Sequence, residues 1–513
     1  MIDLKEGELI LRLFELLLLI SNIGLLGLTV LLKKERRRVP IFIASGITLL
    51  VLAIHWKVEG LRVQLLFPYV LTILFLAGSI YGCFKKTAFR HIPRFILGLA
   101  YTVSAVMLTL TACLMYAFPV FQLPEPTGEH KVGTQIFHLV DKGRDEIFDE
   151  KKKGKRELMV QIWYPAKHAN GQPAPFIEEG PVLKEEPLSK TLGFPSIVMN
   201  YLKYIPSHSY GGAEVSTKSR SYPLIILNHG YKSSRIYHAS QAENLASHGY
   251  IVASIDHTYS AFATVFPDGR TATMKTDEYL IAEKDYRNMV GKVWTDDIAF
   301  VLDQFELINS GQIRTQFKGR IDLDHIGVFG HSFGGAASYD ASYDGRITAG
   351  IDLDGGLYRY HNRPGTTKPF MFIFSESTFD RFNKVRQHHV YTDEELKTMG
   401  ATREEIKKET KDAEAEIAHF RYAASRGRGS RILYVKDMEH YNFADVQFLT
   451  PILRHIGLTG QIDPSRAASI INAYTLSFFD KHLKNKDGRL LEGPDEKFPE
   501  VKFVDSLFDE RKK

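Results

Sequence analysis

Cysteine is almost absent from this chain of 513 residues, which has only two. Both, Cys83 and Cys113, lie inside long apolar runs, so no disulfide can stabilise the polar remainder. This absence excludes a disulfide-rich secretory fold and favours a bacterial cell surface over a eukaryotic secretory lumen.

The chain also lacks a large excess of charge of one sign, because it has 65 Lys and Arg residues and 60 Asp and Glu residues. A net charge of +5 in so long a chain gives no indication of a nucleic-acid partner.

Charged residues are scarce in the first 121 residues. Four apolar segments stand there, each about long enough to cross a ~30 Å hydrocarbon core as a helix: 16–32, 39–56, 63–84 and 95–121. Buried core helices are the alternative, but four such runs joined by short charged links argue against it. A cleaved signal peptide is disfavoured, since the first run leads into basic residues and further spans. We therefore predict an all-α, multi-pass membrane region at 1–121.

Basic residues in the short loops predict how this region is oriented. The loops 33–38 and 85–94 are rich in Lys and Arg, whereas 57–62 is poorer and the N-terminus carries acidic residues. By the positive-inside rule the first and third loops are cytoplasmic and both chain ends lie outside. The sequence thus predicts a multi-pass protein of the cell membrane, with everything after residue 121 on the extracytoplasmic side.

Small residues within the spans, Gly24, Gly27, Ala100 and Ser104, predict close helix packing. We find no pair of acidic or basic residues embedded in the apolar sequence that would indicate an ion path. An anchor is therefore a simpler interpretation than a transporter.

The remainder of the chain is organised around Gly-x-Ser-x-Gly at 330–334. The motif follows an apolar run and precedes an Ala-rich helix start near Ala336. In a strand–turn–helix of this kind the Ser332 hydroxyl is raised above the carboxyl end of a parallel sheet. The first N–H groups of the helix, including that of Phe333, then point at any oxyanion formed there. A bare motif occurs by chance, but its place between strand and helix indicates a serine hydrolase.

Strand and helix patterns alternate around this motif, which predicts a mostly parallel α/β sheet. Two strands are expected first, at 134–140 and 157–164, followed by strands at 222–228, 250–256, 325–330, 349–354, 369–374 and 431–435. Helices are expected at 237–248, 286–307 and 467–483. A charged insertion at 380–428 is predicted to be helical, because Thr392 with Glu395 and Thr402 with Glu405 match capping boxes.

The strand at 222–228 runs into His229-Gly230-Tyr231, where hydrolases of this type place a second oxyanion donor. The backbone N–H of Tyr231 is the candidate for that donor. We interpret His229 as a structural histidine that supports the loop, in preference to a catalytic one.

A base and an acid should follow the nucleophile in chain order, each after a strand. His440 lies between the last strand and the final long helix, where His455 is the only other histidine. Three acids compete to orient it: Asp352, Asp354 and Glu376. Asp352 and Asp354 share one face of their strand by alternation, but Asp354 lies at the end where the site is expected.

Taken together, several segments resemble the platelet-activating factor acetylhydrolases of the plasma and related intracellular type. They are GHSFGGA at 330–336, LD at 353–354, FSE at 374–376 and HYNFAD at 440–445, together with KVG at 131–133, IWYP at 162–165, NHG at 228–230 and ASHG at 246–249. The resemblance covers most of residues 130–485. It implies an α/β-hydrolase fold, with Ser332 as nucleophile, Asp354 as acid, His440 as base, and the N–H groups of Phe333 and Tyr231 as oxyanion hole.

The resemblance further implies calcium-independent hydrolysis of carboxylic esters, with short or oxidised acyl chains of phospholipids as plausible substrates. Neither cofactor nor metal is expected. The secreted relatives lack the four spans, and the insertion at 380–428 looks longer than theirs. We expect a membrane region at 1–121, a linker at 122–130, a catalytic domain at 131–490 and a charged tail at 491–513.

Other classes of function stay open on the same residues. A broad carboxylesterase or lipase, or a polyester hydrolase, would use the same triad. An acyltransferase would pass the acyl group to an alcohol instead of water. A membrane sensor with an inactive hydrolase fold is the alternative outside catalysis.

Overall fold

The computed structural model describes residues 12–32, 38–85, 93–149, 154–169, 171–177, 195–357 and 366–505. The chain forms two compact units. The first comprises Met1–Gln122, Lys184–Pro206 and Phe448–Ile452, and the second comprises Leu123–Leu183, Ser207–Gln447 and Leu453–Lys513. Among the described residues, 195–206 and 448–452, which we had assigned to the catalytic domain, group with the first unit. Most of the two basic loops used to predict orientation, 33–37 and 86–92, lies outside the described residues.

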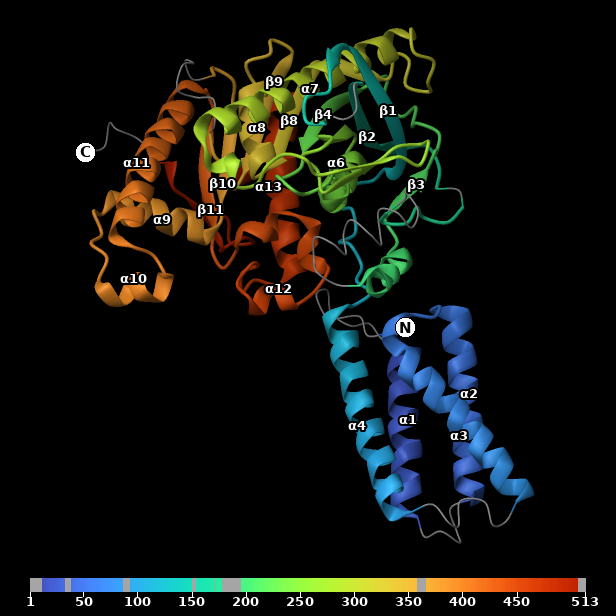
Figure 1. Cartoon of the computed structure of the whole chain (residues 1–513). Coiled ribbons are helices and arrows are strands. Elements are labelled where there is room, and N and C mark those ends of the chain that lie inside the picture. Colours follow the sequence, from blue (N-terminus) through green and yellow to red (C-terminus); the bar gives the residue numbers. More distant parts are fainter. Residues whose placement is uncertain are drawn as a thin grey trace. The chain divides into compact units, whose positions relative to one another are not determined.

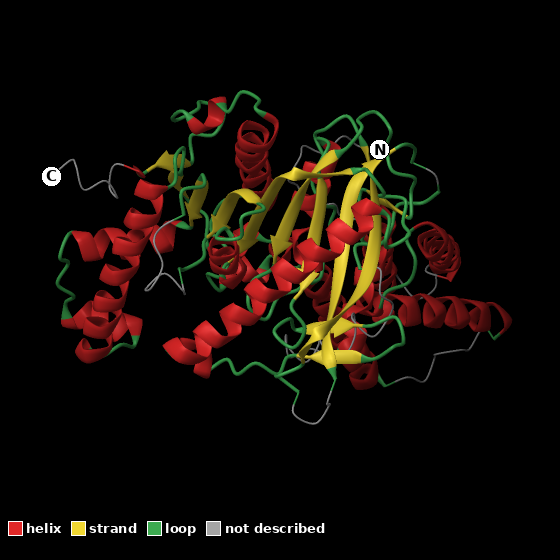
Figure 2. Cartoon of the chain, turned by 90° about the horizontal axis from the view of Figure 1, so that it is seen from above, coloured by secondary structure: helices red, strands yellow, loops and turns green. Residues whose placement is uncertain are grey.

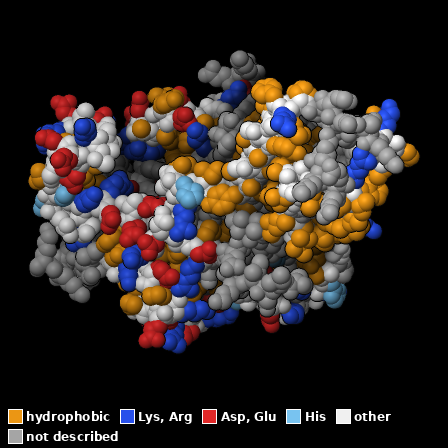
Figure 3. Space-filling model, turned by 90° about the horizontal axis from the view of Figure 1, so that it is seen from below, with side chains coloured by type: hydrophobic (Ala, Val, Ile, Leu, Met, Phe, Trp, Pro, Cys, Tyr) orange, Lys and Arg blue, Asp and Glu red, His pale blue; other side chains and the backbone are white. Residues whose placement is uncertain are grey.

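The first unit is built on four long helices (Figure 1): α1 (Leu13–Leu31), α2 (Arg38–Val58), α3 (Leu66–Phe84), which follows the 3-10 turn η1 (Val63–Leu65), and α4 (Arg94–Ala117). Each is long and apolar enough to cross a membrane. Large apolar side chains such as Leu31, Phe84 and Phe95 are exposed on them, and Figure 3 shows a broad hydrophobic area on the face seen from below. This composition indicates association with a membrane.

Close packing at the small residues of the spans is not found in this chain. A Cβ added at Gly24 or Gly27 would meet no atom within 4 Å, and Ala100 is exposed. The helices meet instead through larger apolar side chains such as Leu18, Leu71 and Leu108, and through a polar contact in which Asn22 Nδ2 on α1 lies 3.0 Å from Thr72 Oγ1 on α3. The packing prediction was therefore wrong for these positions.

A buried ion-pair network at one end of the helices also escaped the sequence analysis. Glu15 Oε1 lies 2.8 Å from Arg12 Nη1 and 3.3 Å from Arg62 Nε. Glu59 accepts two backbone N–H groups at the start of α1 and lies 2.9 Å from His55 Nδ1. Two carboxylates are thus balanced by two guanidiniums, which offsets the cost of burial. These residues lie at or beyond the ends of the predicted apolar segments, so the network does not contradict our expectation that the spans hold no ion path.

The second unit contains a ten-stranded sheet in the order β12-β11-β10-β9-β8-β4-β5-β2-β1-β3. From β11 to β5 every neighbouring pair is parallel, and β12, β2 and β1 pair antiparallel. The strands are β1 (Lys131–Asp145), β2 (Lys155–Ala166), β3 (Ser209–Gly211), β4 (Tyr222–Asn228), β5 (Ile251–Asp256), β8 (Ile321–His331), β9 (Ile347–Leu353), β10 (Phe370–Phe374), β11 (Arg431–Val435) and β12 (Val501–Phe503). Because β12 is an edge strand of this sheet, the region we expected as a tail from residue 491 contributes to the fold.

Helices cover both faces of the sheet (Figure 2). They are α6 (Ala239–Ser247), α7 (Lys284–Ser310), α8 (Phe333–Ala341), α9 (Glu376–Arg386), α10 (Asp393–Met399), α11 (Arg403–Arg426), α12 (Ile452–His455) and α13 (Pro464–Lys484). Both capping boxes expected in the insertion are present, at Thr392 and Thr402. β10 is apolar along its whole length and β4 up to Asn228, and both strands are buried throughout, as expected for strands covered on both faces. A mostly parallel sheet covered in this way confirms the predicted α/β fold class.

Candidate active site

The Gly-x-Ser-x-Gly motif forms a sharp turn between β8 and α8. Ser332 has φ 55° and ψ −122°, a backbone conformation that residues with a Cβ rarely adopt. A Cβ added at Gly330 would collide with the backbone of Gly334, and one at Gly334 would collide with the carbonyls of Asn228 and His229. The two glycines therefore permit the close approach of β4, β8 and α8 that holds the serine in its strained position.

Asp354 and His440 are joined by a short hydrogen bond. Asp354 follows β9, and its Oδ2 lies 2.8 Å from His440 Nδ1. Its Oδ1 accepts the Ser375 N–H at 2.7 Å, so the carboxylate is held from two sides. The Asp354 side chain is 1 % exposed, while that of His440 is 40 % exposed. The carboxylate can accept but not donate, so His440 Nδ1 carries the proton and Nε2 is left to act as a base.

Neither competing acid contacts His440 in the structure. Asp352 is buried beside the start of α8, and its Oδ1 accepts the Gly355 N–H at 2.8 Å. Burial raises the pKa of Asp352 well above its ordinary value, which favours the neutral acid. Glu376 begins α9 and accepts the Asp437 N–H at 2.7 Å. Of the three acids that the sequence left open, only Asp354 lies where it can orient the histidine.

His331 ties the nucleophile turn to the histidine loop. Its Nε2 donates to the carbonyl of His440 at 2.9 Å, and the two ring centroids are 4.5 Å apart. Within the described residues no hydrogen bond joins Ser332 Oγ to His440, a contact that often closes only when substrate binds. His331 was not among the predicted site residues, although its place directly before Ser332 was a signal.

The loop after β4 lies directly against the nucleophile. A Cβ added at Gly230 would come within 3.3 Å of Ser332 Cβ, and the Tyr231 ring packs on Phe333 with centroids 5.8 Å apart. Among the residues described, the Tyr231 N–H has no acceptor. His229 is fully buried, and burial lowers its pKa to about 4, so it is neutral at physiological pH. This agrees with its interpretation as a structural histidine.

Contacts with α6 fix the segment that follows His440. Asp445 accepts the Ser240 N–H at 2.9 Å and also the Ser240 hydroxyl, so it caps the start of α6. Gln241 Nε2 donates to the carbonyl of Phe443 at 2.7 Å. Sequence reasoning gave Asp445 no role of its own, because a helix cap supplied from 205 positions away leaves no local pattern.

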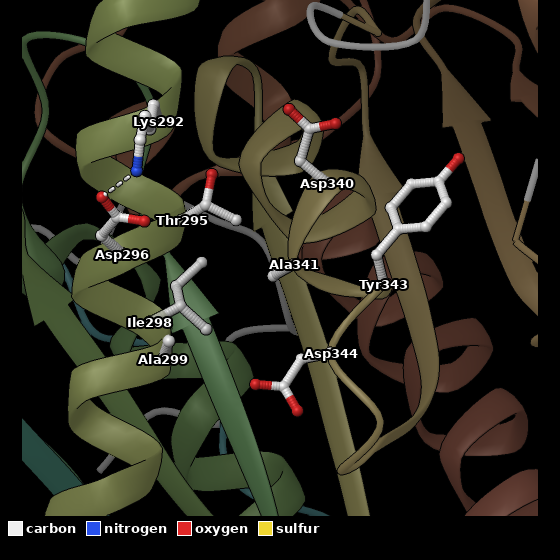
Figure 4. Close-up of a pocket in the computed structure, with 9 residues that line it drawn as sticks. All are labelled: Lys292, Thr295, Asp296, Ile298, Ala299, Asp340, Ala341, Tyr343 and Asp344. Atoms are coloured by element: carbon white, nitrogen blue, oxygen red, sulfur yellow. Dashed lines mark hydrogen bonds and ion pairs between the residues drawn. The ribbon is translucent and has the colours of Figure 1, made fainter. Parts of the chain in front are cut away.

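A separate pocket of about 330 Å³ lies between α7 and the end of α8 (Figure 4). Its walls are Lys292, Thr295, Asp296, Ile298, Ala299, Asp340, Ala341, Tyr343 and Asp344. The figure shows the ion pair of Lys292 with Asp296 at 2.6 Å on one side. None of the candidate site residues lines this pocket, so we do not assign the chemistry to it.

The parallel sheet, the strained serine turn and the acid–histidine pair at the strand ends define the class of protein. It is a carboxylic ester hydrolase of the α/β-hydrolase fold. The family model described as platelet-activating factor acetylhydrolase, isoform II, matches residues 115–498. The chain belongs to this family, which confirms the resemblance drawn from its motifs.

Individual relatives carry corresponding names. The chain is 29 % identical over 341 residues to the platelet-activating factor acetylhydrolase of Cavia porcellus, covering 60 % of this chain and 70 % of the relative. It is 26 % identical over 408 residues to the probable 1-alkyl-2-acetylglycerophosphocholine esterase of Arthroderma benhamiae, covering 75 % and 94 %. A solved structure, the ferulic acid esterase of Streptomyces cinnamoneus, is similar with a TM-score of 0.56 at 27 % identity, covering 75 % of this chain and 99 % of that one.

Proposed function

We propose that the chain is a membrane-anchored serine esterase in which Ser332, Asp354 and His440 form the catalytic triad. The observation that carries this proposal is the 2.8 Å bond between Asp354 Oδ2 and His440 Nδ1 beside the strained Ser332 turn. The three residues follow three strands of one parallel sheet in the chain order that α/β-hydrolases use. The proposed substrates are carboxylic esters, above all short or oxidised acyl chains of phospholipids.

In this mechanism Ser332 Oγ attacks the ester carbonyl carbon while His440 Nε2 takes its proton. Asp354 keeps His440 in the required tautomer and stabilises the imidazolium that forms. The tetrahedral intermediate collapses, and its alcohol leaves with the proton from His440. Water then attacks the acyl-enzyme with His440 again as base, which releases the carboxylic acid and restores Ser332.

The negative charge of the tetrahedral intermediate needs hydrogen-bond donors. We assign this role to the backbone N–H groups of Phe333, the first residue of α8, and of Tyr231. The start of a helix favours an anion, and pre-oriented donors stabilise the developing charge without reorganisation. This chemistry uses only groups of the chain itself.

Two observations support a lipid ester as substrate. The named relatives include a probable 1-alkyl-2-acetylglycerophosphocholine esterase, and four helices of this chain have the length and composition of membrane spans. A broad carboxylesterase is the second candidate, because the similar solved structure is a ferulic acid esterase. We further propose that the catalytic unit lies on the extracytoplasmic side of the cell membrane, where it would meet lipids of the outer leaflet.

Labelling and substrate profiling test this proposal. Full-length protein in detergent is treated with a fluorophosphonate, and the modified residue is identified by peptide mass spectrometry; we expect Ser332. Hydrolysis is then compared for glycerophosphocholines and p-nitrophenyl esters of increasing acyl length, with Ser332→Ala as control. Labelling of another residue would contradict the triad. Equal turnover of feruloyl or polyester substrates would favour the second candidate, and acyl transfer to an added alcohol would indicate an acyltransferase.

A further inference from the structure

Behind the Tyr231 N–H lies a buried polar cluster that the proposed mechanism does not use. It consists of Asn228 and His229 at the end of β4, His257 just after β5, and Asp297 on α7. All four side chains are 0 % exposed. Burying polar groups costs free energy unless they are hydrogen-bonded, so the bonds within this cluster must offset that cost.

His257 contacts both residues that precede the loop. Its backbone N–H donates to His229 Nε2 at 3.2 Å, and its Nε2 lies 3.2 Å from Asn228 Oδ1. The Asn228 amide nitrogen donates to Ser338 Oγ at 3.0 Å, which turns the amide oxygen towards His257. The His257 ring stacks on Trp294 with centroids 3.8 Å apart and planes 12° apart. The ring is therefore held on its face and along its edge.

Asp297 and Arg156 hold His257 from the other side. Asp297 Oδ2 lies 3.0 Å from His257 Nδ1, and Arg156 on β2 binds the same carboxylate twice, at 2.7 and 3.1 Å. Burial raises the pKa of Asp297, but the Arg156 guanidinium and the His257 bond outweigh this and hold it well below its ordinary value. The carboxylate is charged and bound bidentately, which is the most directional of the common ion-pair geometries.

The hydrogen bonds of His229 orient the Tyr231 N–H through the peptide group that joins Gly230 to Tyr231. His229 Nε2 accepts from His257, so its proton is on Nδ1, which donates to the Gly230 carbonyl at 2.7 Å. That carbonyl and the Tyr231 N–H belong to the same planar trans peptide, in which C=O and N–H point in opposite directions. The Gly230 carbonyl also accepts the Ser233 N–H at 3.0 Å, and the shorter bond from His229 is the second donor that holds it. Fixing the carbonyl fixes the direction of the Tyr231 N–H.

We propose that His229 is a positioning residue that aims the Tyr231 N–H at the oxyanion, and that His257 and Asp297 keep His229 in the tautomer and place this requires. The inference rests on the proposed function, in which the Tyr231 N–H is an oxyanion donor. None of the three side chains touches the substrate. Their effect is on the transition state and not on substrate binding.

A matched pair of substitutions tests the role of the Nδ1 proton. In His229→Asn the side-chain amide offers an N–H near the place of Nδ1, whereas His229→Gln places its amide near Nε2 and removes that donor. Removing an oxyanion donor costs about 10²–10³-fold in kcat, so a donor that is merely misdirected should cost roughly 10–100-fold. We expect that loss in kcat for His229→Gln, with KM within about twofold, and at most about fivefold for His229→Asn.

Asp297→Asn extends the test to the residues behind His229, and the neighbouring Asp296→Asn is its control, since Asp296 pairs only with Lys292 at the surface. We expect Asp297→Asn to lower kcat in the same way and Asp296→Asn to leave it unchanged. Binding of a trifluoromethyl ketone, which forms an oxyanion on Ser332, should weaken by the factor lost in kcat. Binding of the matching methyl ketone should not change.

All measurements use the full chain in detergent. Variants that keep Ser332 are normalised to active sites titrated with a fluorophosphonate, so that a misfolded fraction does not count, and Ser332→Ala is compared at equal concentration of folded protein. Equal kcat in wild type, His229→Gln and His229→Asn would overturn the proposal, as would equal losses in both variants accompanied by a higher KM. Ser332→Ala separates this inference from the proposed function. An active Ser332→Ala would refute the triad itself, whereas an inactive one beside a fully active His229→Gln would refute only the positioning role.

Discussion

Replacing Asp354 with Asn is the sharpest test of how His440 is oriented. The amide keeps the shape of the carboxylate, and its oxygen can still accept the Ser375 N–H that Asp354 now binds at 2.7 Å. Asn also tolerates the positive φ of 52° at this position better than most residues, so the turn should survive. The altered property is the atom facing His440 Nδ1, which changes from an acceptor to a donor.

The expected loss of turnover in Asp354→Asn follows from this change of acceptor to donor. A donor at this place forces the proton of His440 onto Nε2, the nitrogen that must accept the proton of Ser332. Loss of the correct tautomer in a serine triad costs about 10⁴-fold in turnover, or about 5.5 kcal/mol at 1.36 kcal/mol per factor of ten. We expect kcat for p-nitrophenyl acetate to fall by about this factor, with partial recovery as the pH rises.

Two neighbouring acids provide matched controls for the assay. Glu376→Gln keeps an oxygen for the Asp437 N–H that Glu376 binds at 2.7 Å, so we expect a loss of no more than about tenfold. Asp352→Asn puts a neutral amide in the place of a buried acid whose pKa is raised by burial. We expect this variant, like Glu376→Gln, to lose no more than about tenfold in kcat. A large loss in Glu376→Gln or Asp352→Asn beside a mild one in Asp354→Asn would show that the wrong carboxylate was chosen.

Three further predictions follow. Ser332→Ala should lower turnover by roughly 10⁴–10⁶-fold without changing the thermal unfolding temperature, and a tenth of wild-type activity would contradict the nucleophile assignment. Protease added to intact cells should degrade residues 130–513, whereas protection until the membrane is opened would reverse the predicted orientation. Burial raises the pKa of Glu243 to about 8 from an ordinary value of 4.5, so the folded state holds a proton that the unfolded state loses first. Stability should therefore fall as pH rises from about 4.5 to 8, and Glu243→Gln should flatten that dependence in thermal unfolding; an unchanged slope would contradict the shift.

Much of the hydrolase fold could be predicted because its signals are local. The apolar strands, the Gly-x-Ser-x-Gly turn and the capping boxes at Thr392 and Thr402 each lie within a few residues. The acid could be narrowed to three candidates but not chosen from residue patterns alone, since all three stand at or near strand ends. The choice needed either the family resemblance or the contact between Asp354 and His440, which spans 86 positions.

The features that we did not predict from the sequence depend on contacts between residues that are distant in sequence. Glu15 and Arg62 pair across 47 positions, and both lie outside the predicted apolar segments, so no local pattern indicated the pair. The edge strand Val501–Phe503 looked like part of a charged tail because only its pairing with β11 makes it a strand. The small residues Gly24 and Gly27 matched a packing motif, but composition alone does not say which helix faces they meet.

Several residues near the candidate site have a strained backbone that local conformational propensity does not predict. At Ser332 the Gly-x-Ser-x-Gly motif predicted the turn correctly. Lys232, Ser332, Asp354 and Asp437 all have positive φ without being glycine, and each stands one to four residues after a strand that ends at the site. Glycine would relieve the strain at any of them, but at Ser332 and Asp354 it would delete the hydroxyl and the carboxylate to which we assign the roles of nucleophile and acid. At Ser332 and Asp354 the proposed chemistry thus requires a side chain that the backbone conformation disfavours, and the packing around the two turns holds that conformation. Local preference alone therefore could not place these two residues, whereas the Gly-x-Ser-x-Gly motif and the order of the strands could.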